Sequence, residues 1–276
     1  MQVSEQMKAE FANDGAIVVR GLFTSDQLKR VRQSFDYGIA HPSPVAKQVF
    51  AGTDDAHFND FSNPENAGEY TAMIKELALD RLVASLWGSK NVWFLGEELF
   101  IKSGGKTGRS PWHQDTSYLA ASGAHLANIW ISFERLPRQN VLEIVRGSHR
   151  GTQYDGASYM DPADPTRPLW GDGSFPRLPD VEAERKQDPT SWDVLSWDLE
   201  PGDALVFHSG SLHGGAPVTP NCPTRHTLVL RFFGDELYYR PLPTAKPDYP
   251  IDLREFDDRS MTPGAPFRPA YYPQLL

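Results

Sequence analysis

The apolar residues of the first ninety positions recur at intervals of three and four, the spacing of amphipathic helices. Three segments show this spacing: residues 4–13, about 24–41 and about 67–86. The first ends at the turn sequence Asn13-Asp14-Gly15, and Thr24 or Ser25 offers a cap for the second. A short β-branched run, residues 17–19, lies between them. The pattern predicts a helical buttress over about residues 1–90.

The period of the pattern changes at Val92. From there the apolar residues form short runs bounded by Gly, Pro, Asn and Asp, which is typical of an antiparallel sandwich or barrel. Four runs are predicted strands: residues 99–102, 128–133, 204–207 and 226–233. In the second run, alternation places Asn128, Trp130 and Ser132 on one face of the sheet. The expected fold class is therefore mainly β (α+β), with helices at the start of the chain.

Two segments lack a clear period. Residues 151–197 are rich in Pro, Asp and Gly, which is typical of a functional or disordered loop. The segment 239–276 is rich in proline and is expected to cross the surface as extended chain. We find no linker that would split the chain, so we expect a single domain over residues 1–276. Its mainly β core would span about residues 91–238.

The charge balance excludes some classes of partner. The chain carries 27 Lys and Arg residues against 36 Asp and Glu residues, a net charge of -9. Nucleic acids and anionic membranes favour basic surfaces, so neither is an expected partner. Cys222 is the only cysteine, which excludes an intrachain disulfide, and the polar start of the chain makes the cytoplasm the expected location. No apolar run is long enough to span a membrane.

The eight histidines include one in the sequence His113-Gln114-Asp115, just after a predicted strand. On an extended backbone, residues two apart project from the same face, so this imidazole and this carboxylate would converge. The pair can bind a metal ion, although such a triplet also arises by chance.

A second segment, residues 201–215, leads from a turn into a strand and ends at His213-Gly214-Gly215. A histidine here would complete a two-histidine, one-carboxylate facial triad, which leaves open coordination positions on Fe(II). The glycines allow close approach and favour His213 as the ligand over His208, which would then be a packed histidine.

Twelve residues after His213, Arg225 opens a predicted strand. Its guanidinium fork suits a carboxylate held by two parallel hydrogen bonds. Arg231 shares the same strand face and is the rival candidate for that role.

In this order the segments resemble the phytanoyl-CoA dioxygenase family of Fe(II)/2-oxoglutarate-dependent oxygenases. The family pattern runs His-x-Asp, then Gly-Asp-x-x-x-Phe-His, a distal His-Gly and an Arg about a dozen residues later, and this chain carries each part. The opening of the chain, residues 11–22, and the sequence Arg146-Gly147-Ser148-His149 also match. The resemblance implies a double-stranded β-helix, a cupin-like jelly roll with N-terminal buttressing helices.

The resemblance also implies roles for particular residues. His113, Asp115 and His213 would bind iron, and Arg225 would hold the distal carboxylate of 2-oxoglutarate. Three further residues match positions that line the co-substrate pocket of the family: Lys102, Gln114 and Trp130. Gly215 stands where the family usually has a hydroxyl residue, which removes one expected hydrogen bond to the co-substrate.

The activity implied is hydroxylation of an unactivated C–H bond with O₂, with release of succinate and CO₂. Asp115 argues against a halogenase, because family halogenases have a small residue there. The expected substrate is a small anionic or zwitterionic metabolite, and an amino- or trimethylaminophosphonate is one such compound. Alternatives are an acyl-CoA or secondary metabolite with the same chemistry, or a non-redox cupin-type metal-binding protein or isomerase. The oligomeric state is not predicted.

Two groups of side chains could contact that substrate. Four arginines lie close together in the sequence and either face solvent or present one or two cations to the substrate: Arg135, Arg138, Arg146 and Arg150. Five aromatic residues could form a lid or a cage for a quaternary ammonium group: Tyr118, Tyr154, Tyr159, Trp170 and Phe175.

Overall fold

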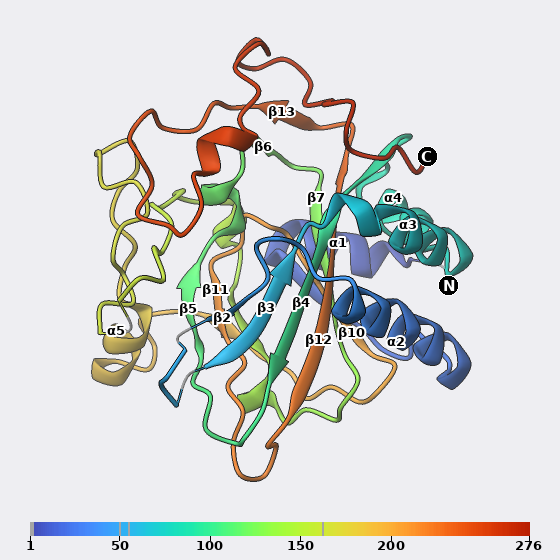
Figure 1. The fold of residues 1–276 in the computed structure, drawn as a ribbon, viewed down its shortest axis with the longest axis horizontal. Coiled ribbons are helices and arrows are strands. Elements are labelled where there is room, and N and C mark those ends of the chain that lie inside the picture. The colour runs from blue at the N-terminus through green and yellow to red at the C-terminus, as the bar shows by residue number, and fades with distance from the viewer. Residues whose placement is uncertain (1–2, 50, 55, 162) are drawn as a thin grey trace.

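Two antiparallel sheets face each other in the computed structural model, which describes residues 3–49, 51–54, 56–161 and 163–276 (Figure 1). The larger sheet has seven strands, in spatial order β1 (Ala16–Val19), β10 (Ala204–Phe207), β7 (Leu126–Ser132), β12 (Arg225–Gly234), β4 (Val92–Lys102), β3 (His57–Phe61) and β2 (Lys47–Val49). The smaller sheet has four, in the order β5 (Ser110–His113), β11 (His213–Gly215), β8 (Leu142–Val145) and β9 (Val194–Leu195). A separate pair joins β13 (Leu237–Tyr239) to β6 (Ala121–Gly123).

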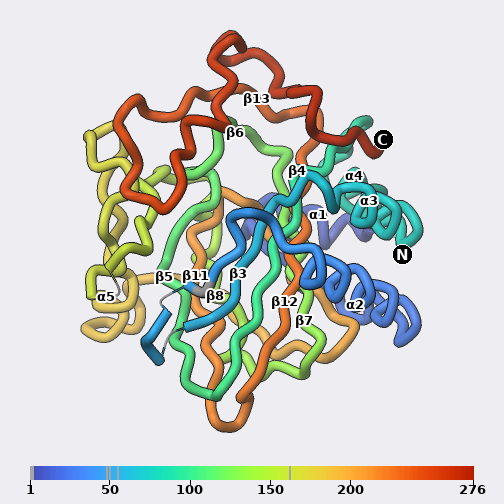
Figure 2. The backbone as a smooth tube through the Cα atoms, viewed as in Figure 1, coloured from blue at the N-terminus to red at the C-terminus, as the bar shows by residue number. Residues whose placement is uncertain are grey.

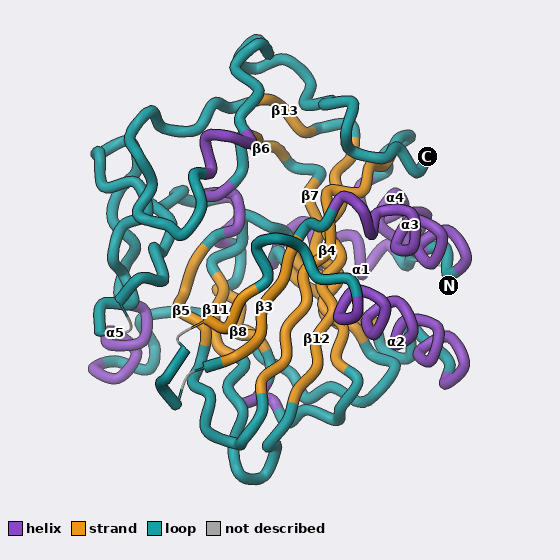
Figure 3. Tube along the Cα trace, in the orientation of Figure 1, coloured by secondary structure: helices purple, strands orange, loops and turns teal. Residues whose placement is uncertain are grey.

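Helices cover the outer face of the larger sheet, on the right in Figure 3. They are α1 (Glu5–Asp14), α2 (Ser25–Ala40), α3 (Ala67–Glu76) and α4 (Leu79–Trp87). The predicted cap of the second helix is confirmed, since Thr24 and Gln27 form a reciprocal capping box. The predicted stop of the first is confirmed by Gly15, which adopts a φ of 79° at the C-cap of α1.

Alternation along the central strands separates two apolar cores. Ile129 and Ile131 of β7 point outward and pack with the buttressing helices. Trp130, between them, points inward and packs with Leu142 and Ile144 of the smaller sheet. The predicted division of residues 128–133 into two faces is therefore confirmed, and the space between the sheets is the interior in which a site can form.

The prediction that the first ninety residues are a helical buttress needs correction. They also supply β1, β2 and β3 to the larger sheet, and only the first of these was signalled by a β-branched run. The helix predicted over residues 67–86 is two helices, because Ala78 has a φ of 55° between α3 and α4. This break has no Gly or Pro to announce it.

The long loop and the tail both carry some regular structure. Residues 151–197 contain α5 (Val181–Gln187) and β9, and the tail contains a short 3-10 helix, Leu253–Phe256. Figure 2 shows the tail, in red, crossing the end of the barrel above the loop, in yellow. Its end is tied to the larger sheet, where the Leu275 amide donates to the Val92 carbonyl at 2.7 Å. Of the helices described, none is long and apolar enough to cross a bilayer.

Candidate metal centre

Three predicted ligands meet in the interior between the sheets. His113 ends β5, Asp115 opens the 3-10 turn Asp115–Tyr118, and His213 opens β11 beside His113 in register. One ligand atom from each lies within 4.8 Å of the other two. We call these residues the metal triad.

The Asp115 carboxylate is oriented by two neighbours. Its Oδ2 accepts a hydrogen bond of 2.6 Å from the Asn128 amide and lies 3.6 Å from Nε of Arg231. Its Oδ1 then faces the two imidazoles, 3.4 Å from Nε2 of His113 and 3.7 Å from Nε2 of His213. One carboxylate oxygen is thereby held toward the position that a metal ion would take.

Backbone carbonyls set the tautomers of the two histidines. Nδ1 of His113 donates to the Pro111 carbonyl and Nδ1 of His213 to the Ser211 carbonyl, each at 2.9 Å. Each Nε2 is then the unprotonated nitrogen that faces the carboxylate. Burial lowers the pKa of His213 to about 4, and the adjacent His113 adds to this effect.

Asp115 is ionised in the same environment. Burial would raise its pKa, but His213, His113 and Arg231 together hold the pKa well below the usual range. Two neutral imidazoles and one carboxylate are the donor set of non-haem Fe(II) sites with open positions, so the residues fit that metal.

The rival ligand His208 lies outside this group. Its Nδ1 accepts a hydrogen bond of 2.9 Å from the Gly210 amide, and its Nε2 is 3.2 Å from the Gly123 carbonyl. Burial, together with His149, lowers its pKa to about 3. His208 is therefore a neutral, packed histidine.

Arg225 is a buried cation whose contacts are neutral. Its Nε donates to the Thr227 hydroxyl at 3.0 Å, and it also donates to the Ala216 carbonyl, three residues after His213. Its guanidinium carbon lies 5.5 Å from the ring centre of Trp130. Burial lowers the pKa of Arg225 to about 10. No carboxylate of the described residues pairs with it, so the interior has the charge to bind an anion.

The rival Arg231 already has acidic partners. It donates to the carboxylate of Glu98 and approaches Asp115. Burial would lower the pKa of Arg231, but these two carboxylates raise it above the usual range. Arg231 thus orients Asp115, whereas no carboxylate of the described residues forms an ion pair with Arg225.

Lys102 and Gln114 occupy different settings. Lys102 is buried opposite Arg225 in the β4–β12 register, and its ammonium donates to the Gly108 carbonyl at 2.9 Å. The Gln114 amide donates to the Gly210 carbonyl at 2.8 Å, and its oxygen accepts from the Tyr154 amide at 2.8 Å. These bonds fasten the start of the long loop to the connection before His213.

The four clustered arginines do not face the metal triad. They bind exposed acids or a backbone carbonyl: Arg135 with Glu200, Arg138 with Asp198, Arg146 with Asp14 and Asp193, and Arg150 with the Asn13 carbonyl. The reading of a solvated face is confirmed, and the alternative of an inward cation is wrong.

The predicted aromatic cage is only partly correct. Tyr118 and Tyr159 lie beside His113, with ring centres at 6.2 Å and 5.7 Å. The other three predicted members pack in the apolar clusters behind these tyrosines, and no ring contact of the described residues joins them to His113: Tyr154, Trp170 and Phe175. Tyr249, in the tail, joins these two tyrosines, and its ring centre lies 5.7 Å from that of Tyr118 and 6.4 Å from that of Tyr159. We call Tyr118, Tyr159 and Tyr249 the tyrosine wall.

Sequence reasoning missed Tyr249 and the lysine beside it. The ammonium of Lys47, from β2, lies 5.3 Å from the ring centre of Tyr249. Neither residue belongs to a motif or to a periodic apolar pattern, so the sequence carries no signal that could have found them.

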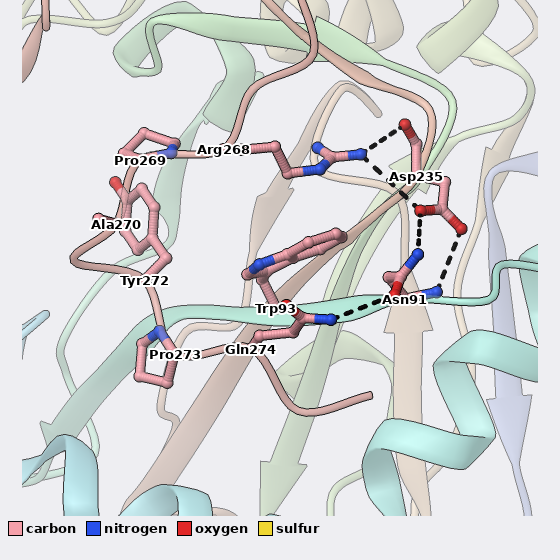
Figure 4. Close-up of a pocket in the computed structure, with 9 residues that line it drawn as sticks. All are labelled: Asn91, Trp93, Asp235, Arg268, Pro269, Ala270, Tyr272, Pro273 and Gln274. Carbon is pink, nitrogen blue, oxygen red and sulfur yellow. Dashed lines mark hydrogen bonds and ion pairs between the residues drawn. The ribbon is translucent and has the colours of Figure 1, made fainter.

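A separate cleft of about 600 Å³ lies where the tail meets β4 (Figure 4). Its polar groups bind one another, since Asn91 donates to Asp235 at 2.8 Å and the Arg268 guanidinium lies 4.1 Å from the ring centre of Trp93. It shares no residue with the metal triad.

The chain is similar to known proteins over most of its length. A family model described as "Phytanoyl-CoA dioxygenase (PhyH)" matches residues 11–227. The peroxisomal phytanoyl-CoA dioxygenase of Mus musculus is 26% identical over 222 residues. That match covers 74% of this chain but 61% of the mouse protein, so the chain spans less than two thirds of that relative.

Solved structures share the fold at low identity. The non-heme alpha ketoglutarate dependent carbocyclase SnoK from nogalamycin biosynthesis superposes with a TM-score of 0.69 at 14% identity, covering 99% of this chain and 96% of SnoK. The epimerase SnoN, in complex with Fe3+, alpha ketoglutarate and nogalamycin RO, gives 0.68 at 17% identity, covering 99% and 98%. The jelly-roll fold expected from the sequence is confirmed. The chain belongs to the phytanoyl-CoA dioxygenase family.

Proposed function

We propose that this protein is an Fe(II)- and 2-oxoglutarate-dependent dioxygenase that hydroxylates an unactivated C–H bond of a small anionic or zwitterionic metabolite. The observation that carries the proposal is the meeting of two features in one interior. One is the metal triad with its inward Nε2 atoms, and the other is the buried guanidinium of Arg225 with neutral contacts only.

His113, Asp115 and His213 would hold the iron, and Arg225 would hold the distal carboxylate of 2-oxoglutarate by a forked pair of hydrogen bonds. The Thr227 hydroxyl accepts a hydrogen bond from Nε of Arg225 and so orients the guanidinium. Gly215 has no hydroxyl and would leave this orientation to Thr227. Lys102 and Trp130 would line the co-substrate pocket, because Lys102 is paired with Arg225 in register and Trp130 stacks under it. Gln114 would act through the loop that it fastens rather than by contact with the co-substrate.

Bound there, iron supplies the activation of O₂ that converts 2-oxoglutarate to succinate and CO₂ and oxidises the substrate. The protein's part is placement and the exclusion of water. Asn128 and Arg231 fix the metal-binding oxygen of Asp115, and the half-buried tyrosine wall closes the interior beside His113.

The fold also occurs in a carbocyclase and an epimerase, so hydroxylation needs to be distinguished from ring closure and epimerisation. Hydroxylation adds one oxygen to the product, ring closure removes two hydrogens, and epimerisation leaves the mass unchanged. Mass spectrometry of the product therefore separates them.

Cys222 is a free, buried thiol, which suits a reducing compartment such as the cytoplasm, and that location stays a prediction.

The direct test is anaerobic addition of Fe(II) and then 2-oxoglutarate, followed by absorbance. The proposal requires a weak visible charge-transfer band and, after addition of O₂, release of succinate. A screen of small phosphonates and carboxylates beside an acyl-CoA then tests the substrate class. No band in the wild-type protein would refute the oxygenase proposal, and turnover with the acyl-CoA alone would refute the small-metabolite proposal.

A further inference from the structure

The tyrosine wall is assembled from three separate parts of the chain. Tyr118 follows Asp115 in the same 3-10 turn, Tyr159 comes from the long loop, and Tyr249 comes from the tail. Tyr249 also lies beyond residue 227, where the match to the family model ends. The wall therefore includes a residue that the family pattern does not supply.

Several bonds hold the wall in place. The Tyr118 hydroxyl donates to the Ala157 carbonyl at 2.6 Å, which ties the long loop to the turn that carries Asp115. Beside Tyr249, the Asp248 amide donates to the Leu169 carbonyl at 2.7 Å, and Arg167 pairs with the Asp248 carboxylate at 2.6 Å. The loop and the tail thus form one wall beside His113.

Tyr159 has an unusual backbone for its type. Its φ is 59°, in the left-handed region that a bulky side chain rarely adopts. The strained backbone places its ring 5.7 Å from the ring of His113, edge to face. Such strain is typical of binding sites, where the surrounding structure holds a side chain in a required position.

Two polar groups beside this wall have no hydrogen-bond partner among the described residues: the Lys47 ammonium and the Tyr249 hydroxyl. Lys47 is half-buried, and its ammonium lies over the ring of Tyr249. Glu98 acts on Lys47 electrostatically, but Arg231 and Asn59 already bind that carboxylate. Burial lowers the pKa of Lys47, and an anion bound to the ammonium would offset that effect.

The tyrosines add neutral donors, not negative charge. Burial raises the pKa of Tyr249 above its usual range. A cation entering beside Tyr249 would meet the charge of Lys47 already on that ring. The ammonium of Lys47 therefore favours an anion at this place.

We propose that Lys47 and Tyr249 bind the anionic group of the substrate, a carboxylate or phosphonate, and that Tyr118 and Tyr159 hold the remainder of it beside the metal triad. The proposal rests on the proposed function and deepens it, because it names the group that the enzyme selects. These four residues are specificity determinants that touch the substrate.

The test is calorimetric binding of ethylphosphonate, propionate and tetramethylammonium to protein loaded anaerobically with Fe(II) and saturating 2-oxoglutarate, so that Arg225 is occupied. Wild-type protein should bind an anionic probe and not tetramethylammonium. Lys47→Met should weaken anion binding about 10- to 100-fold, and Tyr249→Phe about 3- to 10-fold. Lys47→Arg keeps the charge and should stay within about threefold of wild type.

Lys29→Met is the matched control, because Lys29 is an exposed lysine on α2 paired with Asp26. It should bind as wild type does. Failure of wild type to bind either anion, preferential binding of tetramethylammonium, or equal anion affinity in Lys47→Met would each overturn the proposal. The charge-transfer band of the same samples distinguishes failure of this proposal from failure of the proposed function. A band without anion binding refutes only the anion site, whereas absence of the band refutes the proposed function.

Discussion

The metal triad and the tyrosine wall lie side by side, yet the chain builds them in different ways. His113 and His213 sit on neighbouring strands in register, and Asp115 follows two residues after the first. The wall instead combines a turn, a loop and the tail. The regular geometry of paired strands therefore defines the cofactor side, whereas the packing of irregular segments defines the substrate side. The comparison predicts that changes on one side leave the other side's binding intact.

The largest effect should follow loss of a triad ligand. Loss of a group that only orients a ligand typically costs 10- to 100-fold in metal affinity, so His213→Ala should weaken Fe(II) binding by more than about 100-fold. Anaerobic titration of the Fe(II)·2-oxoglutarate band measures this. His226→Gln changes a histidine that pairs with Glu134 outside the triad and should keep the band. A normal band in His213→Ala would show that the triad is not the metal site.

The next largest effect concerns the co-substrate. Arg225→Met removes a buried, charge-assisted contact and should raise the Kd for 2-oxoglutarate about 100-fold, with Fe(II) affinity little changed. Calorimetry under nitrogen measures both. Arg231→Met should instead weaken Fe(II) binding, because Arg231 orients Asp115. If Arg231→Met rather than Arg225→Met raised the 2-oxoglutarate Kd, the clamp would be Arg231.

His208 distinguishes a packed histidine from a ligand through the pH dependence of stability. Its folded pKa is about 3, below the unfolded value of about 6.5. Above about pH 6.5 neither state is protonated and stability is complete; as pH falls toward about 3, only the unfolded chain gains the proton, so stability falls. His208→Gln should make that decline shallower by up to about 1.4 kcal/mol per pH unit.

Urea unfolding at neutral and mildly acidic pH measures this slope in both proteins. The Fe(II)·2-oxoglutarate band should survive in His208→Gln, since the residue lies outside the triad. Identical slopes in the two proteins would contradict the assignment of His208 as a buried neutral group.

The smallest effect should come from the ion pair that joins the loop to the tail. Arg167 and Asp248 are 46% and 38% exposed, so Asp248→Asn should cost at most about 1 kcal/mol of unfolding free energy. Affinities for Fe(II) and 2-oxoglutarate should not change. A several-fold change in either affinity would mean that the tyrosine wall and the metal triad are coupled. It would contradict the expectation that changes on one side leave binding on the other side intact.

The sequence predicted the cofactor side well because its signals are local. Alternation along residues 128–133 placed Trp130 in the interior, and the His-x-Asp spacing placed two ligands on one face. The glycines after His213 favoured it over His208, and the structure brings His213 together with His113 and Asp115. Each inference needed only a few neighbouring residues and the periodicity of a strand.

The substrate side was predicted poorly because its partners are distant in the chain. Tyr154 and Trp170 resemble Tyr159 in sequence, and only the packing of the loop decides which of these rings lies against His113. Lys47 lies in a three-residue edge strand with no apolar pattern. The same limit hid the contacts of Asn128 and Arg231 with Asp115, which depend on two strands, β7 and β12, and a turn coming together.

The supply of Tyr249 by the tail has an evolutionary consequence. The segment that carries it contains none of the triad ligands and neither of the interior cations Arg225 and Lys102. Mutations there can alter which molecule is accepted while the oxidising machinery is inherited unchanged. Related enzymes can thus diversify in preference by exchanging a short stretch of chain, and the same stretch is the natural target for laboratory recombination.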